Sequence, residues 1–220
     1  MTTVYLFPGQ GADERLFSKI KPGSNFRMVH VNYPVPEKGA TMADYAGIIC
    51  RQIDTTGKYI LIGVSLGGMI CSELADILKP EKIIIVSSAK NRHELPMRYK
   101  FKNIKWLHSI TPKRLIKWGA QVLQPIVEPD RNKSKDIFKS MLGSKSPIYY
   151  KRTVNMIINW QREHYNDDII HIHGTDDRTL PIINVKAHFK IDKGSHVMTL
   201  TRGDELNEII LSILNSVKEG

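Results

Sequence analysis

The chain has 220 residues, of which 41% are hydrophobic, so it is long enough for one domain with a sizeable buried core. No apolar run approaches the ~20 residues of a membrane-spanning helix, and no signal peptide is recognisable, which argues against an integral membrane protein. The net charge of +10 is concentrated in residues 91–165, which hold 16 Lys and Arg and five Asp and Glu, whereas the remainder holds 16 and 17.

Short apolar segments rich in strand-forming residues recur along the chain. They predict six strands, at Val4–Phe7, Phe26–Val31, Tyr59–Val64, Ile83–Val86, Ile169–Ile172 and Val185–Ile191. Helical patterns lie between several of them, at Thr41–Ile53 and Leu66–Leu78, and another at Asp204–Val217 closes the chain. This alternation is typical of parallel strands joined by crossover helices. The fold class expected is therefore α/β, a three-layer sandwich around a mainly parallel sheet of about six strands.

Residues 91–165 interrupt this alternation, because they are basic and form several helical patterns separated by prolines. These prolines are Pro96, Pro112, Pro125, Pro129 and Pro147. We expect a single domain over residues 1–220, with residues 1–90 and 166–220 as its core. Residues 91–165 are expected to be a helical cap, or lid, inserted into that core.

The strongest local motif is the segment 59–68, where an apolar strand runs into Gly-Val-Ser-Leu-Gly and then into a helical pattern. A G-x-S-x-G sequence in this setting is typical of a nucleophile elbow, although the pattern alone also fits a glycine-rich turn. The turn is so sharp that side chains at Gly63 and Gly67 would collide with neighbouring backbone. Ser65 is therefore the candidate nucleophile, and the Leu66 N–H, at the positive end of the following helix, is positioned to stabilise an oxyanion.

A serine nucleophile needs a histidine base and a carboxylate, which follow it in the order acid and then histidine in this architecture. Asp177 lies just beyond the strand Ile169–Ile172, where the sites of parallel sheets gather, and is the candidate acid. Its neighbour Asp176 is the alternative. His196 lies between the last strand and the last helix and is the candidate general base.

A metallohydrolase is the rival interpretation, because His171 and His173 are two residues apart on a strand. The binuclear pattern H-x-H-x-D-H would require Asp at position 175 and His at 176, where the chain has Thr175 and Asp176. We therefore expect no metal and no cofactor, and we expect the two histidines to pack or hydrogen-bond on the strand. Cys50 and Cys71 lack zinc-type spacing and fit a cytoplasmic location.

With the serine, the acid and the histidine in order, the chain resembles the α/β-hydrolase superfamily along nearly its whole length. It is most similar to small esterases of the plant methylesterase and hydroxynitrile-lyase branch. Residues 6–11, Leu-Phe-Pro-Gly-Gln-Gly, stand where these proteins carry a strand, a His-Gly pair and a residue that completes the oxyanion hole. The resemblance gives that role to Gln10, with Gly9 and Gly11 as alternatives in another loop register.

The segment after the last strand carries the same resemblance. His196 is followed by Met198 and a closing helix, as in that branch. Its cyanohydrin-cleaving members have a lysine directly after the histidine and a threonine in the first loop, where this chain has Val197 and Gly9. The resemblance therefore implies hydrolysis of a small-molecule carboxylic ester through an acyl-enzyme, rather than lyase chemistry.

The basic segment leaves two further functions open. Among its cations lie aromatic residues that include Trp106, Trp118, Tyr149, Tyr150 and Trp160. They could line an acyl pocket with a positive rim, which would suit an anionic substrate such as a CoA or carrier-protein thioester, or the cations could form a solvated face. A catalytically silent binding module of the same fold is the other alternative. The scattered cations do not establish the continuous stripe that nucleic-acid binding needs.

Overall fold

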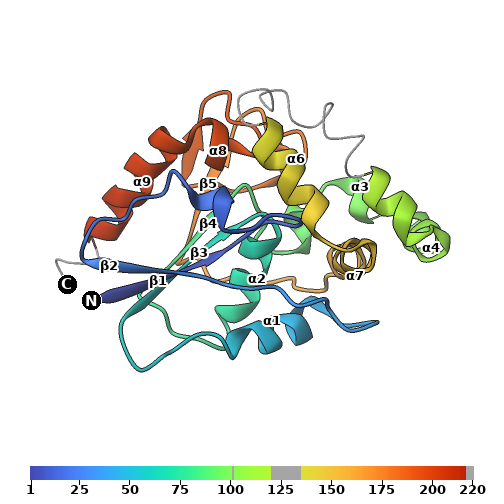
Figure 1. Cartoon of the computed structure of the whole chain (residues 1–220), viewed down its shortest axis with the longest axis horizontal. Coiled ribbons are helices and arrows are strands. Elements are labelled where there is room, and N and C mark those ends of the chain that lie inside the picture. Colours follow the sequence, from blue (N-terminus) through green and yellow to red (C-terminus); the bar gives the residue numbers. More distant parts are fainter. Residues whose placement is uncertain (101, 120–134, 217–220) are drawn as a thin grey trace.

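A computed structural model describes residues 1–100, 102–119 and 135–216, and these contain one sheet of six strands (Figure 1). The strands are β1 Thr2–Phe7, β2 Phe26–His30, β3 Tyr59–Val64, β4 Lys82–Val86, β5 Ile169–Gly174 and β6 Phe189–Ile191. Their order in the sheet is β2-β1-β3-β4-β5-β6, and every neighbouring pair is parallel. The expected parallel α/β sheet is confirmed.

The two faces of the sheet form two separate hydrophobic clusters, because successive side chains of a strand point to opposite faces. On β3, Leu61 belongs to the cluster under the helices α1 and α2, whereas Ile60 and Ile62 belong to the cluster under α9. The central strands β3 and β4 are buried on both faces, which accounts for their continuous apolar runs. Helices, sheet and helices thus form three layers (Figure 1).

Four helices pack on the two faces of the sheet. They are α1 Met42–Cys50, α2 Leu66–Leu74, α8 Met198–Thr201 and α9 Gly203–Ser216. At the start of α1, the Thr41 side chain accepts a hydrogen bond from the Asp44 N–H, and the Asp44 carboxylate accepts one from the Thr41 N–H. This capping box explains why the helical pattern begins there. The three helices expected from the sequence are present, and two of them end a few residues earlier than expected.

The last strand differs from its prediction. Residues Val185–Ile191 were expected to be extended throughout, but only Phe189–Ile191 pair with β5 as a strand. The preceding residues form a 3-10 turn at Ile182–Asn184 that begins after Pro181. The predicted run therefore consists of irregular backbone over residues 185–188 and a short edge strand, which a period-2 pattern does not separate.

The 91–165 segment supplies helices beyond the carboxyl ends of the strands (Figure 1). They are α3 Met97–Lys100, α4 Lys102–Ile110, α6 Lys135–Ser144 and α7 Pro147–Ile158, with residues 113–119 also helical. Pro147 is the first residue of α7, where its missing N–H costs nothing. Pro125 and Pro129 lie outside the described residues.

Two smaller expectations concern membrane spans and cysteines. Across the part of the chain that the structure describes, no helix is long and apolar enough to cross a membrane. Cys71 is buried in α2, as expected, whereas Cys50 at the end of α1 is only partly buried.

Candidate active site

The candidate nucleophile lies in the turn between β3 and α2. Ser65 has a positive φ of 53° with ψ of −118°, a conformation that side chains rarely adopt. A Cβ on Gly63 would lie 2.5 Å from the main-chain oxygen of Gly67, and a Cβ on Gly67 would collide with the Phe7 carbonyl group. The expected reason for both glycines is thus confirmed, because the turn has no room for a side chain at Gly63 or at Gly67.

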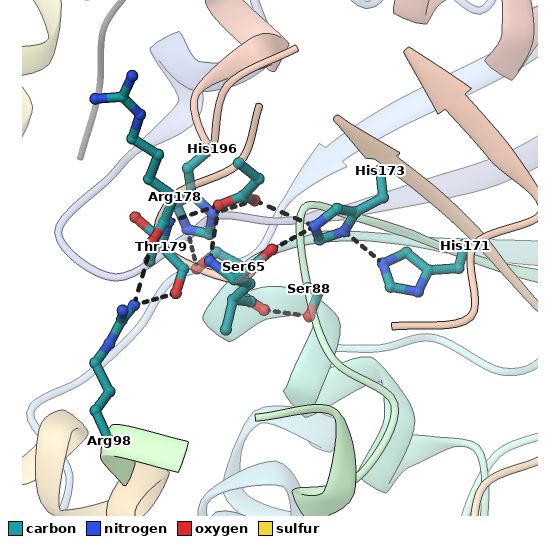
Figure 2. A network of polar contacts seen from close by, with 10 residues as sticks. Ser65, Ser88, Arg98, His171, His173, Arg178, Thr179 and His196 are labelled. Atoms are coloured by element: carbon teal, nitrogen blue, oxygen red, sulfur yellow. Dashed lines mark hydrogen bonds and ion pairs between the residues drawn. The ribbon is translucent and has the colours of Figure 1, made fainter. Parts of the chain in front are cut away.

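Two hydrogen bonds hold the strained serine backbone. The Ser65 N–H donates to the Val86 carbonyl at the end of β4, at 3.0 Å. The Ser88 hydroxyl donates to the Ser65 carbonyl at 2.7 Å (Figure 2). A backbone in such a region costs on the order of 1–3 kcal/mol, so surrounding contacts must fix it. The loop after β4 therefore supports the turn that carries Ser65.

The candidate acid lies in the turn that follows β5. One carboxylate oxygen of Asp177, Oδ1, accepts hydrogen bonds from the main-chain N–H groups of Thr179 at 2.9 Å and Leu180 at 2.7 Å. Asp177 is only 3% exposed, whereas its neighbour Asp176 is exposed to solvent. Of the two aspartates, the structure turns Asp177 inward.

His196 connects the acid to the serine. Its Nδ1 lies 2.8 Å from Asp177 Oδ2, and its Nε2 lies 2.9 Å from Ser65 Oγ (Figure 2). Because an ionised carboxylate only accepts hydrogen bonds, Nδ1 carries the proton, and the free Nε2 lone pair then accepts from the serine hydroxyl. The three side chains thus form a continuous hydrogen-bonded chain from three different loops.

The groups around Asp177 favour its ionised form. Burial raises the pKa of Asp177, but the charge of His196 and its hydrogen bond, together with His173 and the Leu180 N–H, outweigh burial. The net result is a pKa below the ordinary value for aspartate. Asp177 is therefore a carboxylate at neutral pH and can stabilise a positively charged His196.

The loop after β1 lies beside the serine. A Cβ added to Gly9 would lie 3.4 Å from the Ser65 Cβ, so the loop passes directly over the nucleophile. The Gln10 side chain donates from Nε2 to the Thr153 hydroxyl of α7 at 2.5 Å. Leu66 is the first residue of α2, where N–H groups have no partner within the helix. The geometry is compatible with the expected roles of the Gln10 and Leu66 main-chain N–H groups, which stay predictions.

The five aromatic residues of the 91–165 segment that could line a pocket differ in exposure and position. Tyr149 and Tyr150 of α7 are buried, and the Tyr150 hydroxyl lies against Gly11 of the loop after β1. Trp106 and Trp118 are more than half exposed. Trp160 is buried, but its indole N–H donates to Glu73 near the end of α2 farthest from Ser65. Of these five aromatic residues, the two tyrosines therefore lie next to the candidate site.

Three contacts around the site were not foreseen from the sequence. Thr153 anchors Gln10, as described above. Arg98 of α3 donates to the main-chain carbonyls of Arg178 and Thr179 (Figure 2). These two residues belong to the acid loop, the segment 175–180 that follows β5 and carries Asp177. His173 Nε2 lies 2.7 Å from the Leu180 carbonyl in the same loop. Each joins residues that sequence patterns treat separately, so no local signal predicted them.

The metal-site rival finds no support in the arrangement of side chains. His171 Nε2 and His173 Nδ1 lie 3.0 Å apart and hydrogen-bond to each other instead of converging on a common point. Among the described residues, no group of three or more His, Cys, Asp or Glu side chains is arranged to hold a metal ion. The expectation that these histidines hydrogen-bond on their strand is confirmed.

Comparison with known proteins places this architecture. No family model and no curated protein matches the sequence. Among solved structures, a thermophilic esterase from Thermogutta terrifontis superposes with a TM-score of 0.77 at 16% identity, over 99% of this chain and 90% of that one. The chain has the α/β-hydrolase fold. An esterase from Exiguobacterium antarcticum has a TM-score of 0.68 at 14% identity, over 98% and 92% of the two chains.

A third structure broadens the comparison within the α/β-hydrolase fold. ClbQ from the colibactin NRPS/PKS pathway matches with a TM-score of 0.64 at 13% identity, over 99% of this chain and 98% of that one. These matches cover nearly the whole of both chains. At such low identity the likeness describes the fold, and function must be argued from the site.

Proposed function

We propose that this protein is a serine hydrolase that cleaves small-molecule carboxylic esters, with Ser65 as nucleophile, His196 as general base and Asp177 as the orienting acid. One observation carries the proposal: His196 bridges Ser65 Oγ at 2.9 Å and Asp177 Oδ2 at 2.8 Å. Both distances are within the reach that proton transfer and orientation require. The similarity to solved esterases supports the same reaction class.

The first half-reaction forms the acyl-enzyme. His196 Nε2 takes the proton of the Ser65 hydroxyl while Oγ attacks the ester carbonyl carbon. Asp177 holds Nδ1–H and stabilises the imidazolium that results. The tetrahedral intermediate collapses when its C–O bond to the alcohol breaks, and the imidazolium gives its proton to the departing alcohol oxygen.

The second half-reaction releases the acid. Water attacks the acyl carbon as His196 removes its proton, and the bond to Ser65 Oγ then breaks, with the proton returned to the serine. In both halves the carbonyl oxygen becomes negative beside the start of α2 and the loop after β1. The main-chain N–H groups of Leu66 and Gln10 are the proposed donors, and each such donor typically contributes a few kcal/mol of transition-state stabilisation.

We propose that the 91–165 segment is a cap that selects the acyl substrate. Its α7 presents Tyr149 and Tyr150 next to the loop that carries Gln10. The same segment carries 16 basic and five acidic residues, so an approaching anionic group would be attracted to it. This charge favours one second candidate, hydrolysis of a thioester carried on an anionic CoA or carrier protein.

The test combines an active-site probe with a substrate panel. A fluorophosphonate reagent should label the wild-type protein, should not label Ser65→Ala, and should label His196→Ala far more slowly. Turnover should fall on the order of 10⁶-fold in Ser65→Ala. Undiminished ester turnover in that variant would overturn the serine mechanism.

The panel decides between the two substrate classes. Acyl esters, methyl esters and acyl thioesters of equal chain length are compared by kcat/KM, each against the Ser65→Ala background. Preference for an anionic thioester would favour the second candidate. Labelling without turnover of any substrate would instead indicate a binding module that keeps a reactive serine.

A further inference from the structure

Two buried histidines extend the hydrogen-bonded chain behind Asp177. His171 and His173 of β5 are both completely buried, and their rings meet edge to face with centroids 5.0 Å apart. His173 Nε2 lies 3.4 Å from Asp177 Oδ2, the same oxygen that faces His196 (Figure 2). The proposed mechanism uses neither residue, yet both continue its line of polar groups into the core.

The contacts of this pair fix the positions of its hydrogens. The Leu180 carbonyl can only accept, so the proton of a neutral His173 lies on Nε2, 2.7 Å from that oxygen. His173 Nδ1 is then an acceptor, and His171 must donate to it from Nε2 across 3.0 Å. His171 Nδ1 is left as a bare lone pair, and among the described residues it has no hydrogen-bond partner.

The surroundings keep both rings neutral. Burial lowers the pKa of His171, and the charges of His173, Lys90 and His188 lower it further. Burial also lowers the pKa of His173; Asp177 and the Leu180 carbonyl oppose this shift, and His196 adds to it. A neutral ring beside Asp177 leaves the charge of the carboxylate available to His196.

Leu180 connects the pair to the acid. Its N–H donates to Asp177 Oδ1, and its carbonyl accepts from His173 Nε2, so one peptide segment is held by both side chains. The carboxylate thereby receives a fixed orientation from the loop, and the loop receives its own from β5. Displacement of a catalytic group by about 1 Å can cost about 100-fold in rate, so this support is consequential.

We propose that His173 is a positioning residue, which His171 holds as the Nε2–H tautomer, and that it orients Asp177 toward His196 by tethering the Leu180 carbonyl. The effect on catalysis rests on the proposed function. The tautomers of the two histidines and the hydrogen bond to the Leu180 carbonyl do not depend on it. The role belongs to the neutral pair and involves no proton transfer to substrate.

The first test needs only the wild-type protein. Nitrogen-15 NMR of the histidine side chains at pH 7 should show both His171 and His173 as neutral Nε2–H tautomers. It should also show a hydrogen-bonded proton on His196 Nδ1. A charged pair, or a proton on His173 Nδ1, would overturn the proposal whatever reaction the protein catalyses.

The second test compares two substitutions at one position. His173→Gln keeps an N–H donor for the Leu180 carbonyl, whereas His173→Leu removes it. In His173→Leu, kcat should fall roughly 10- to 100-fold with KM nearly unchanged, and the His196 Nδ1 proton signal should weaken. His173→Gln should recover most of both.

Outcomes of this comparison separate the inference from the function. A folded His173→Leu with wild-type kcat and an unchanged Nδ1 signal would sink the inference, while loss of turnover in Ser65→Ala would still uphold the serine mechanism. Ester turnover that survives in Ser65→Ala would remove the mechanism, yet the tautomer measurement would stand. If His173→Leu does not fold, the wild-type NMR experiment decides.

Discussion

The core of the molecule, residues 1–90 and 166–220, differs from the 91–165 segment in charge, in burial and in what it brings to the site. The core carries nearly balanced charge, buries its central strands β3 and β4 on both faces and brings Ser65, Asp177 and His196 together. The 91–165 segment carries the whole excess of positive charge and leaves large side chains such as Trp106 and Trp118 exposed. The core holds the three proposed catalytic side chains at hydrogen-bonding distance, and the segment presents large apolar side chains to solvent.

The two regions share a buried hydrophobic cluster, to which the segment contributes side chains such as Tyr149, Tyr150 and Met156, and specific polar contacts join them beside the site. Thr153 of α7 holds Gln10 in the loop after β1, and Arg98 of α3 holds the carbonyls of the acid loop. Each contact joins a helix of the segment to a loop that carries a proposed catalytic group. The comparison therefore predicts that core substitutions change the rate strongly, that contact residues change it moderately, and that outer charges change only selectivity.

After Ser65→Ala, the largest expected effect tests the acid in the core. Asp177→Asn should lower kcat by about 10⁴-fold, because an amide favours the wrong tautomer of His196 and cannot stabilise the imidazolium. Steady-state ester hydrolysis measures the loss. Asp176→Asn is the matched control, and because Asp176 is exposed it should retain nearly full activity. The reverse ranking would move the acid to position 176.

A smaller effect is expected at the contact between the regions. Thr153→Val removes the hydroxyl that accepts from Gln10 Nε2 and leaves the shape of the side chain nearly unchanged. If this contact sets the loop after β1, kcat should fall by roughly 10-fold with the oxyanion donor misplaced. Thr153→Ser keeps the hydroxyl and should behave like wild type. Equal activity in both variants would show that the loop holds its position without this hydrogen bond.

The buried histidines predict how core stability depends on pH. The unfolded chain binds protons near pH 6.5, whereas the folded chain, with the pKa values of His171 and His173 lowered, binds them only at lower pH. The free energy of unfolding should therefore fall as pH decreases from about 6.5, by on the order of 1 kcal/mol for each pKa unit of difference.

Urea unfolding at several pH values between 7 and 5 measures this slope. His171→Leu removes one of the two groups and should flatten it, whereas the exposed control His164→Leu should retain the wild-type slope. A slope that is the same in all three proteins would contradict the assignment of neutral buried rings.

The smallest effect is expected from outer charges of the segment. Replacing the exposed residues Lys105, Lys113 and Arg114 by glutamate should raise KM for an anionic substrate several-fold, and added salt should reduce the difference. Because these side chains lie away from the reacting atoms, kcat should not change.

A charge-matched control isolates the location of the charges. Glutamate at Lys21, Lys58 and Lys79, which are exposed in the core, changes the net charge by the same amount. The control should leave KM nearly unaltered. An equal rise in both triple variants would mean that total charge, not the segment, governs binding.

Sequence patterns predicted the core well because its constraints are local. The apolar runs of β3 and β4, and the glycines on both sides of Ser65, follow from burial and from turn geometry within ten residues. The chain order of acid and histidine then placed the remaining candidates at strand ends. The main error, the length of β6, came from a predicted strand whose first four residues, 185–188, have irregular backbone.

What the sequence did not predict depends on contacts between distant residues. Gln10 and Thr153 are 143 positions apart, and neither carries a signal that selects the other. The hydrogen bond between His173 and the Leu180 carbonyl depends on the path of residues 177–180. That path is fixed in part by the Asp177 carboxylate, which accepts from the Leu180 N–H. Helical periodicity in the 91–165 segment predicted helices but not which aromatic side chains face the site.

The positive φ of Ser65 has a consequence for how this protein can evolve. Glycine adopts that conformation without strain, so Ser65→Gly should be inactive yet should unfold at a higher temperature than wild type in differential scanning calorimetry. Selection for stability alone would then favour losing the nucleophile first. A serine that is retained at position 65 in related proteins would thus indicate continued selection for turnover, because selection for thermal stability alone favours glycine there.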